Sequence, residues 1–229
     1  MPTLRIASYN VHRAIGRDRK CLPQRILDVL REIDADVVAL QEVEARDGGA
    51  DMLARLGEQT GFAAIAGTTL IRHDGHYGNG LLTRLPIRDR LLCDLSWRGR
   101  EPRGAIAADL DAGHGEPLRI VATHLGLRPA ERRDQVTRLI KLFTDVPRER
   151  AVLLGDVNEW FLWGRPLRRL HRYFKETPSI ATFPSSLPVF ALDRVWTHPR
   201  SLLRTLKVHK SPLARMASDH LPLVATLEV

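Results

Sequence analysis

Short apolar runs that end in a chemically competent polar side chain constrain this sequence more than any other feature. The clearest run covers residues 151–154; Gly155 breaks it, and Asp156 and Asn158 follow at once. A run this short and this apolar predicts a strand that is buried on both faces. In a layered fold, ligands usually bind at the carboxyl ends of such strands. However, Gly, Asp and Asn also dominate turns, so this motif taken alone favours a simple turn.

The same arrangement recurs at three other places in the chain. The other runs are residues 4–9 before Asn10 and His12, residues 37–40 before Gln41 and Glu42, and residues 120–123 before His124. One such case is ordinary turn chemistry, whereas four in one chain favour strands that converge on a shared site.

Composition indicates a soluble globular protein. The chain has 229 residues, of which 44% are hydrophobic and 27% are charged, and this is ordinary for a folded domain. No apolar stretch approaches the roughly 20 residues that span a bilayer. A strand-like run begins almost at the N-terminus and leaves no room for a signal peptide, so we expect a cytoplasmic protein. Cys21 and Cys93 are expected to be reduced, and a monomer is the default expectation.

The charge balance favours an anionic partner. The formal net charge is +8 and the isoelectric point is about 10.2. Excess arginine favours nucleic acid, anionic lipid head groups or other phosphate esters. Simple solubility, or the arginine usage of a GC-rich genome, would give the same balance, so the charge alone has modest weight.

The periodicity of apolar residues predicts helices and strands in two successive groups. Helices are expected at 22–33, 50–60, 129–143 and 163–174, and strands at 4–9, 36–41, 62–66, 80–83, 90–95, 105–110, 118–124, 151–155, 192–197, 203–208 and 221–228. No linker, repeat or low-complexity tract divides them, so we expect one domain over residues 1–229. Two sheets packed face to face with helices outside would use every element, although a single mixed sheet is also compatible with this pattern.

The polar positions form an ordered set from Asn10 to His220. The motifs are Ser-Tyr-Asn-Val-His at 8–12, Leu-Gln-Glu-Val at 40–43, Gly-Asn-Gly-Leu-Leu at 78–82, Pro-Arg-Gly at 102–104, Thr-His-Leu at 123–125, Gly-Asp-Val-Asn at 155–158, Leu-Asp-Arg-Val at 192–195 and Ser-Asp-His-Leu-Pro at 218–222. This set resembles the endonuclease/exonuclease/phosphatase superfamily over nearly the whole chain. That superfamily includes pancreatic-type deoxyribonucleases, abasic-site endonucleases, inositol-polyphosphate 5-phosphatases and neutral sphingomyelinases. The resemblance implies a four-layer α/β/β/α sandwich of two packed mixed sheets with helices outside.

The chemistry of phosphoester hydrolysis predicts a site for a hard cation. The reaction needs such a cation, an activated water and donors for the developing negative charge. Mg²⁺ prefers oxygen ligands and keeps several waters, so one or two carboxylates suffice. Glu42 is the first candidate ligand, with Asn10 beside it and Asp219 as another. We expect Mg²⁺ as the cofactor, with Mn²⁺ as a possible substitute.

The resemblance also implies the roles of the catalytic residues. The match of Asp156 orients or deprotonates the attacking water, and the matches of Asn158 and His124 contact phosphate. The match of Asp193 supports that of His220, and this pair polarises the phosphoryl group. The logic is physically sound, because a carboxylate fixes the tautomer of an imidazole and raises its pKa.

Substrate contacts are assigned to four further residues. Asn79 would donate to substrate or make a turn with its neighbouring glycines, and Arg103 would grip a phosphate oxygen or pair with a surface acid. Arg165 and Arg168 lie in a basic helical segment, which is either solvated or holds a polyanion or an anionic membrane. The segment 182–184 and Trp196 either line the far wall of the site or belong to the core.

These observations predict an Mg²⁺-dependent phosphoesterase that hydrolyses a phosphodiester by in-line attack of water, without a covalent intermediate. The substrate would be nucleic acid or a lipid or head-group diester. A phosphomonoesterase acting on a small phosphate ester is the enzymatic alternative, since the chain is short for its superfamily. A non-catalytic module that binds nucleic acid or membrane, and a purely structural protein, rank lower because the chain retains the polar set.

Overall fold

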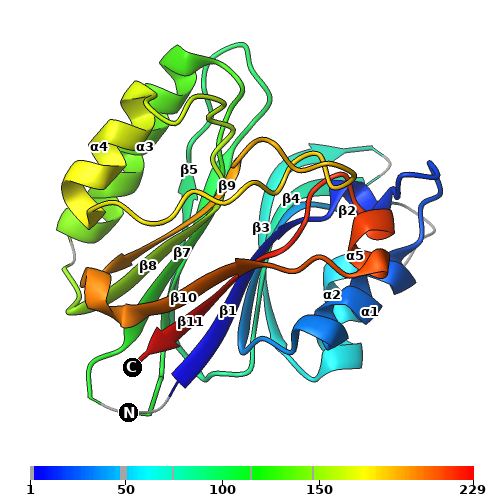
Figure 1. The fold of residues 1–229 in the computed structure, drawn as a ribbon, viewed down its shortest axis with the longest axis horizontal. Helices are drawn as coiled ribbons and strands as arrows, with labels where there is room; N and C mark the ends of the chain where they lie inside the picture. The colour runs from blue at the N-terminus through cyan, green and yellow to red at the C-terminus, as the bar shows by residue number, and fades with distance from the viewer. Residues whose placement is uncertain (1–2, 47–50, 74, 114, 146) are drawn as a thin grey trace.

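Two β-sheets stacked face to face, with helices on both outer faces, make up the computed structural model (Figure 1). It describes residues 3–46, 51–73, 75–113, 115–145 and 147–229. One sheet has six strands in the order β10-β11-β1-β2-β4-β3, and the other has five in the order β5-β6-β7-β8-β9. The predicted four-layer α/β/β/α sandwich is therefore confirmed, and the alternative of a single mixed sheet is wrong.

The elements follow the predicted order closely. The strands are β1 (Thr3–Asn10), β2 (Val37–Arg46), β3 (Ala63–Arg72), β4 (Gly75–Thr83), β5 (Ile87–Asp94), β6 (Gly104–Leu110), β7 (Leu118–His124), β8 (Arg150–Asp156), β9 (Asp193–His198), β10 (Leu203–Val208) and β11 (Leu223–Glu228). The helices are α1 (Pro23–Ile33), α2 (Met52–Thr60), α3 (Pro129–Thr144), α4 (Arg165–Phe174) and α5 (Pro212–Ala217), with short 3₁₀ turns at His12–Ala14 and Arg200–Leu202.

Both sheets are mixed, and the connections explain which strand pairs are parallel. The pairs β1–β2 and β7–β8 are parallel, and in each case a helix, α1 or α3, lies between the two strands in sequence. A parallel pair needs such a crossover, whereas hairpins join antiparallel strands. Between residues 63 and 124, where no helix intervenes, the pairs β3–β4, β5–β6 and β6–β7 are antiparallel.

Alternation along the strands builds three apolar cores between the four layers. In β8, Val152 and Leu154 face the other sheet, while Leu153 faces α3 and α4. In β1, Ile6 faces the other sheet and Tyr9 faces the layer of α1, α2 and α5. Because β7 and β8 are covered on both faces, they read as nearly continuous apolar runs.

Helix ends follow local rules. Pro23 occupies the first turn of α1, and the helix stops at Asp34, which has a positive φ of 48°. The Asp51 side chain accepts the backbone N–H groups of Leu53 and Ala54 and so caps α2, which ends at Gly61 with φ 72°. The helix was predicted to begin at Ala50, a residue that lies outside the described part of the chain.

Three local differences from the predicted elements bear on the site. β2 does not end at Gln41 as predicted but continues to Arg46 through a bulge between Leu40 and Val43. β4 begins at Gly75, five residues earlier than predicted, so Asn79 lies within a strand rather than in a turn. The short α5 is not predicted by apolar periodicity. Among the described residues, no helix combines the length and the apolar character needed to cross a membrane.

Candidate active site

Strand ends from both sheets bring the predicted polar residues together. Asn10 is the last residue of β1, while His124 and Asp156 are the last residues of β7 and β8. Asp193 opens β9 and pairs directly with Asp156 across the antiparallel β8–β9 ladder. The ends of strands from the two packed sheets therefore meet at one edge of the sandwich.

Unusual backbone conformations place the side chains at this edge. Gly155 has φ 146°, and a Cβ atom there would overlap the Thr123 carbonyl oxygen of the neighbouring strand. Glycine is thus required where β7 and β8 approach most closely. Glu42, in the bulge of β2, has φ 58°, and Asn158 has φ 49°. Such conformations cost about 1–2 kcal/mol for a non-glycine residue and often persist at functional sites.

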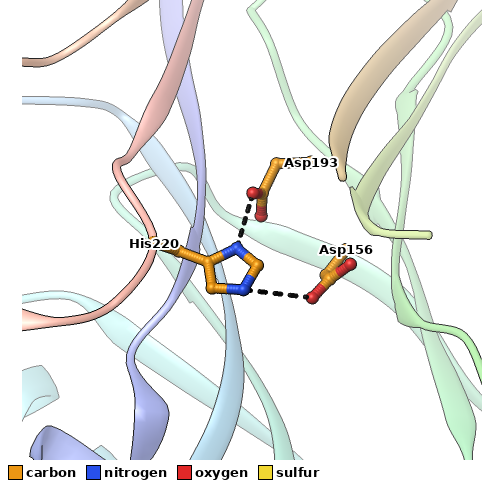
Figure 2. A group of neighbouring side chains, drawn as sticks. All are labelled: Asp156, Asp193 and His220. Carbon is orange, nitrogen blue, oxygen red and sulfur yellow. Dashed lines mark hydrogen bonds and ion pairs between the residues drawn. The ribbon is translucent and has the colours of Figure 1, made fainter. Parts of the chain in front are cut away.

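His220 lies between two buried carboxylates (Figure 2). Its Nδ1 is 2.8 Å from Asp193 Oδ2, and its Nε2 is 3.8 Å from Asp156 Oδ2. The Thr182 hydroxyl donates to the same Asp193 oxygen at 2.6 Å. Phe183 packs its ring 4.8 Å from the imidazole. The Asp193 carboxylate therefore accepts the Nδ1 proton, and Nε2 is directed toward Asp156.

The two carboxylates hold His220 in its protonated form. Burial by itself would lower the pKa of His220, but attraction and hydrogen bonding to Asp193, with further attraction to Asp156 and Asp219, raise that pKa to about 10. Burial raises the pKa of Asp156 to about 6, although His220, the Asn158 backbone N–H and the Asn10 amide oppose this increase. At neutral pH the site therefore holds an imidazolium beside an ionised Asp156 that retains appreciable basicity.

Arg103, His124 and Asn158 form a second group of polar side chains in the site. Arg103 Nη1 lies 2.9 Å from Glu101 Oε1 and 3.2 Å from His124 Nδ1. Burial, with the positive charges of Arg103 and His220, lowers the pKa of His124 well below its usual value, so the ring is neutral. His124 Nε2 lies 3.6 Å from Asp156 Oδ2. A neutral imidazole has only one nitrogen that accepts, so the ring can accept a hydrogen bond from Arg103 or from the Asn158 amide, but not from both. The Asn158 amide, which donates to the Leu125 carbonyl, lies 3.0 Å from this Nε2.

Asn10 links the carboxylates of the two sheets. Its Nδ2 donates to Glu42 Oε1 and to Asp156 Oδ2, each at 3.1 Å. Glu42 and Asp156 therefore share one polar cluster, rich in the oxygen donors that hard divalent cations prefer. A second group, Asp156, Asp193 and His220, offers ligand atoms within 4.8 Å of one another. The donor set fits a divalent cation, and its oxygen content favours the Glu42 side, because Asp193 already occupies Nδ1 of His220.

A cavity of about 330 Å³ opens over these groups. Of the predicted site residues, seven line it: Asn10, Glu42, Arg103, His124, Asp156, Asn158 and His220. Asp193 is fully buried and lies behind His220.

Besides Asp193, four of the predicted site residues do not line this cavity. Asn79 donates its amide to the Gly104 carbonyl at 3.0 Å and so joins β4 to β6 across the sandwich. Asp219 approaches His12, with Oδ1 3.7 Å from Nδ1, and its backbone carbonyl accepts the Ser185 N–H. Arg165 and Arg168 line a second cavity, of about 520 Å³, between α3 and α4. Their direct contact with substrate in the Asp156 site stays a prediction.

The lining of the active-site cavity also includes residues that the sequence did not indicate as site residues, among them Arg13, Glu44, Arg72, Glu101, Leu127 and Trp160. Glu44 had a usable signal, since it stands two residues after Glu42 and side chains two apart share a strand face. Arg72 reaches the cavity from the end of β3, which extends well beyond its predicted end at residue 66. Glu101 lies in an irregular loop, where no periodicity indicates which side chains turn inward.

The segment 182–184 and Trp196 were predicted either to line the far wall of the site or to belong to the core, and each alternative is correct for some of these residues. Phe183 lines the cavity, and Thr182 contacts Asp193. Trp196 is fully buried in the core between the five-stranded sheet and helices α3 and α4. Side chains alternate between the two faces of β9. Trp196 therefore points toward helices α3 and α4, while Val195 faces the other sheet.

Comparisons with known proteins agree with this fold. The chain is 26% identical to YbhP, an uncharacterized protein of Escherichia coli (strain K12), over 99% of this chain and 97% of that protein. An endonuclease/exonuclease/phosphatase structure from Beutenbergia cavernae superposes with a TM-score of 0.82, 23% identity, and coverage of 100% and 72% of the two chains. The human Nocturnin catalytic domain with bound sulfate gives a TM-score of 0.75, 18% identity, and coverage of 99% and 94%.

The family match covers most of the chain. Residues 7–220 match the family described as Endonuclease/Exonuclease/phosphatase family, a span that includes every polar residue brought together above. The chain therefore belongs to the endonuclease/exonuclease/phosphatase family, whose members are phosphoric ester hydrolases such as nucleases and phosphatases.

Proposed function

We propose that this chain is a single-domain, cytoplasmic, Mg²⁺-dependent phosphoesterase that hydrolyses a phosphodiester by in-line attack of water. The observation that carries the proposal is the placement of His220 between Asp193 and Asp156, at 2.8 and 3.8 Å, in a cavity shared with Asn158 and Arg103. Nucleic acid and lipid or head-group diesters are the candidate substrates.

Asp156 orients and deprotonates the attacking water. Its Oδ1 accepts the Asn158 backbone N–H at 2.9 Å, and its Oδ2 accepts the Asn10 amide at 3.1 Å, so the carboxylate is fixed in direction. With a pKa raised to about 6, it is ionised at neutral pH and basic enough to accept a proton in the transition state.

Donors on both sides of the cavity stabilise the negative charge that develops on phosphorus-bound oxygens. His220 contributes a buried positive charge, and Asp193 compensates it from behind. Arg103 and the Asn158 amide contribute donors from the opposite wall. Preorganised donors in a buried site are worth more than the same groups in water, because they need no reorientation during the reaction.

Glu42 and Asn10 would hold the cation, since they lie side by side at 3.1 Å on the cavity wall. Bound Mg²⁺ would neutralise phosphate charge and lower the pKa of a coordinated water. A diester fits the electrostatics of the cavity. Its lining includes the carboxylates Glu42, Glu44, Glu101 and Asp156 beside three arginines, so a singly charged phosphate group is met with less repulsion than a doubly charged one.

Activity assays on two site variants test the proposal. The wild type is expected to hydrolyse bis(p-nitrophenyl) phosphate with Mg²⁺ or Mn²⁺ and to lose this activity in EDTA. Asp156→Asn and His220→Gln should each reduce kcat by about 10³-fold or more while circular dichroism shows a folded protein. Asp89→Asn and His198→Gln, at exposed positions outside the cavity, are the matched controls and should retain wild-type turnover.

A panel of DNA, RNA, phospholipid and inositol phosphates, assayed side by side, then assigns the substrate. Hydrolysis of monoesters but not of diesters would contradict the diester assignment. Near-normal turnover in both site variants would falsify the mechanism.

A further inference from the structure

Four consecutive apolar residues are exposed in the loop that follows the catalytic strand β8. Trp160, Phe161, Leu162 and Trp163 are 41%, 58%, 55% and 70% exposed. Isolated apolar residues on a surface are ordinary, but an exposed run of this length is unfavourable in water unless it serves a function. The loop joins Asn158 of the active site to the start of α4.

A buried network holds this loop in place. Glu159 is 3% exposed, and its carboxylate accepts Arg132 Nε and Nη2 at 3.3 and 3.2 Å and the Phe161 backbone N–H at 3.3 Å. The Gly164 N–H closes the turn on the Phe161 carbonyl at 3.0 Å. A Cβ atom at Gly164 would overlap the Glu159 carboxyl group. The apolar side chains are thus presented from a fixed base rather than from a frayed segment.

A second exposed apolar segment extends this surface toward the active-site cavity. Leu187, Val189 and Phe190 are 72%, 60% and 38% exposed. The Trp160 ring lies 4.8 Å from that of Phe190 and 5.8 Å from that of Phe183, which joins the two segments. Trp160 also lines the cavity, together with Leu127, which is 63% exposed. The apolar rim is defined as Leu127, Trp160, Phe161, Leu162, Trp163, Leu187, Val189 and Phe190.

A group of arginines that pair with no carboxylate in the described part of the chain begins two residues beyond Trp163. The arginine cluster is defined as Arg133 of α3 and Arg165, Arg168, Arg169 and Arg172 of α4, which line one cavity of about 520 Å³. All five are exposed. Arg169 donates to the Thr137 hydroxyl, and within the described residues no carboxylate pairs with any member of the cluster. Positive charge that is not neutralised locally is available to an anionic partner.

We propose that the apolar rim and the arginine cluster together dock this protein onto an anionic phospholipid membrane. The rim would enter the interfacial region, where tryptophan and leucine side chains are favoured, and the arginines would contact head-group phosphates. The aliphatic members of the rim distinguish this partner from nucleic acid. Bases stack on aromatic rings and guanidinium planes, whereas Leu162, Leu187 and Val189 offer no stacking surface.

The location of the rim has a consequence for the substrate. Because Leu127 and Trp160 belong both to the rim and to the cavity wall, docking would bring the cavity mouth to the lipid head groups. A lipid phosphodiester would then reach Asp156 without leaving the membrane. This step, unlike the docking itself, rests on the proposed function.

Vesicle flotation tests docking without any need for turnover. The full chain carrying Asp156→Asn, and therefore inactive under the proposed function, is mixed with vesicles of phosphatidylcholine alone or of equal phosphatidylcholine and phosphatidylglycerol. Binding to the anionic vesicles is expected, with a blue shift of tryptophan fluorescence. Adding Phe161→Ser and Trp163→Ser should reduce the partition coefficient at least tenfold. The control pair Leu91→Ser and Leu92→Ser, each 55% exposed on β5, should have no effect.

The electrostatic part has its own matched pair of variants. Arg168→Gln with Arg172→Gln should weaken binding to anionic vesicles severalfold, whereas Arg31→Gln with Arg55→Gln, on the helices of the other outer layer, should not. Equal vesicle binding by the rim variant and its parent overturns the proposal. The proposal is also overturned if the rim variant keeps its binding to vesicles but loses its binding to a single-stranded oligonucleotide. Neither result affects the proposed hydrolysis, which is assayed separately on a soluble substrate.

Discussion

At the scale of single residues, the site depends on groups that act through a neighbour. Asp193 Oδ2 accepts both His220 Nδ1 at 2.8 Å and the Thr182 hydroxyl at 2.6 Å. The other oxygen, Asp193 Oδ1, is buried without a hydrogen-bond partner in the part of the chain that the structure describes. Thr182 is therefore the group that fixes the rotation of the carboxylate, and through it the direction of the imidazole.

Removing the Thr182 hydroxyl should lower the turnover rate but not weaken substrate binding. We expect Thr182→Val to lower kcat by about tenfold with an unchanged KM, since a small misplacement of a catalytic group is costly. Thr182→Ser, which restores the donor, should recover most of the loss. Steady-state kinetics measures both, and the downfield Nδ1 proton resonance of His220 should broaden in the valine variant only. Equal kinetics for the valine and serine variants would rule out this positioning role.

A second prediction at the scale of single residues concerns Gly155. A Cβ atom in Gly155→Ala would overlap the Thr123 carbonyl oxygen, and φ is 146°. We expect unfolding free energy to fall by more than about 3 kcal/mol, because strand backbone has to move. Gly99→Ala is the control, since Gly99 has φ 72° but no atom within 4 Å of the built Cβ, so only the left-handed backbone costs about 1–2 kcal/mol. Urea denaturation measures both, and equal losses would contradict the steric argument.

At the scale of elements, an ion-pair cluster joins three consecutive segments of the five-stranded sheet. Asp109 of β6 accepts Arg119 Nε of β7 at 2.8 Å and Arg148 Nη2, from the segment before β8, at 2.7 Å. The Asp109 side chain is only 3% exposed. Burial alone would raise the pKa of Asp109, but the hydrogen bonds and charges of the two arginines outweigh it and lower that pKa. The folded state therefore favours the ionised carboxylate.

This cluster predicts both a stability loss and its pH dependence. Asp109→Asn removes the carboxylate charge that Arg119 and Arg148 contact and should lower unfolding free energy by about 3–5 kcal/mol at neutral pH. Because the folded pKa is depressed, the wild-type contribution is present above the unfolded value near 4 and is lost as pH falls below it. Denaturation of both proteins from pH 7 to pH 3 should therefore show the difference shrinking. Asp111→Asn, at a more exposed ion pair with Arg88, should lose much less stability, because solvent screens an exposed pair.

At the scale of the whole molecule, the site lies across the seam between the two sheets. Asn10 of β1 donates to Asp156 of β8, and Asn79 of β4 donates to the Gly104 carbonyl of β6. Glu42 belongs to the six-stranded sheet and Asp156 to the five-stranded sheet. A cation held among these carboxylates would therefore stabilise the packing of the two halves.

Metal binding should accordingly raise global stability. At an Mg²⁺ concentration 100-fold above its Kd, we expect about 2.7 kcal/mol of added unfolding free energy. Glu42→Gln should remove most of this increment, whereas Glu58→Gln, exposed on α2, should keep it. Thermal denaturation with Mg²⁺ and with EDTA measures the effect. Full stabilisation in Glu42→Gln would move the cation to another site, such as the Asp156, Asp193 and His220 group.

Much of the fold followed from patterns that act over short distances. The buried runs of β7 and β8, the apolar face of α1 and the crossover helices are set by alternation, helical periodicity and chain connectivity, and these are readable along the sequence. Two features could not be predicted from the sequence: the bulge through which β2 continues past Glu42, and the early start of β4. Both depend on pairing with a partner strand. The cavity positions of Arg13 and Glu101 likewise follow from loop packing rather than from any repeat.

The sequence by itself determined the succession of helices and strands along the chain and the identity of the acids, amides and imidazoles at strand ends, since these follow from local pattern and residue chemistry. The four layers followed only from the family resemblance, because the local pattern also allowed a single mixed sheet. Only the tertiary structure decided which of these groups meet. It placed Asn79 between the sheets, Asp219 beside His12 and Arg165 in a separate arginine-lined cavity. The pKa values of His220 and Asp156 also belong to the assembled site, because burial and opposing charges exist only once distant segments pack together.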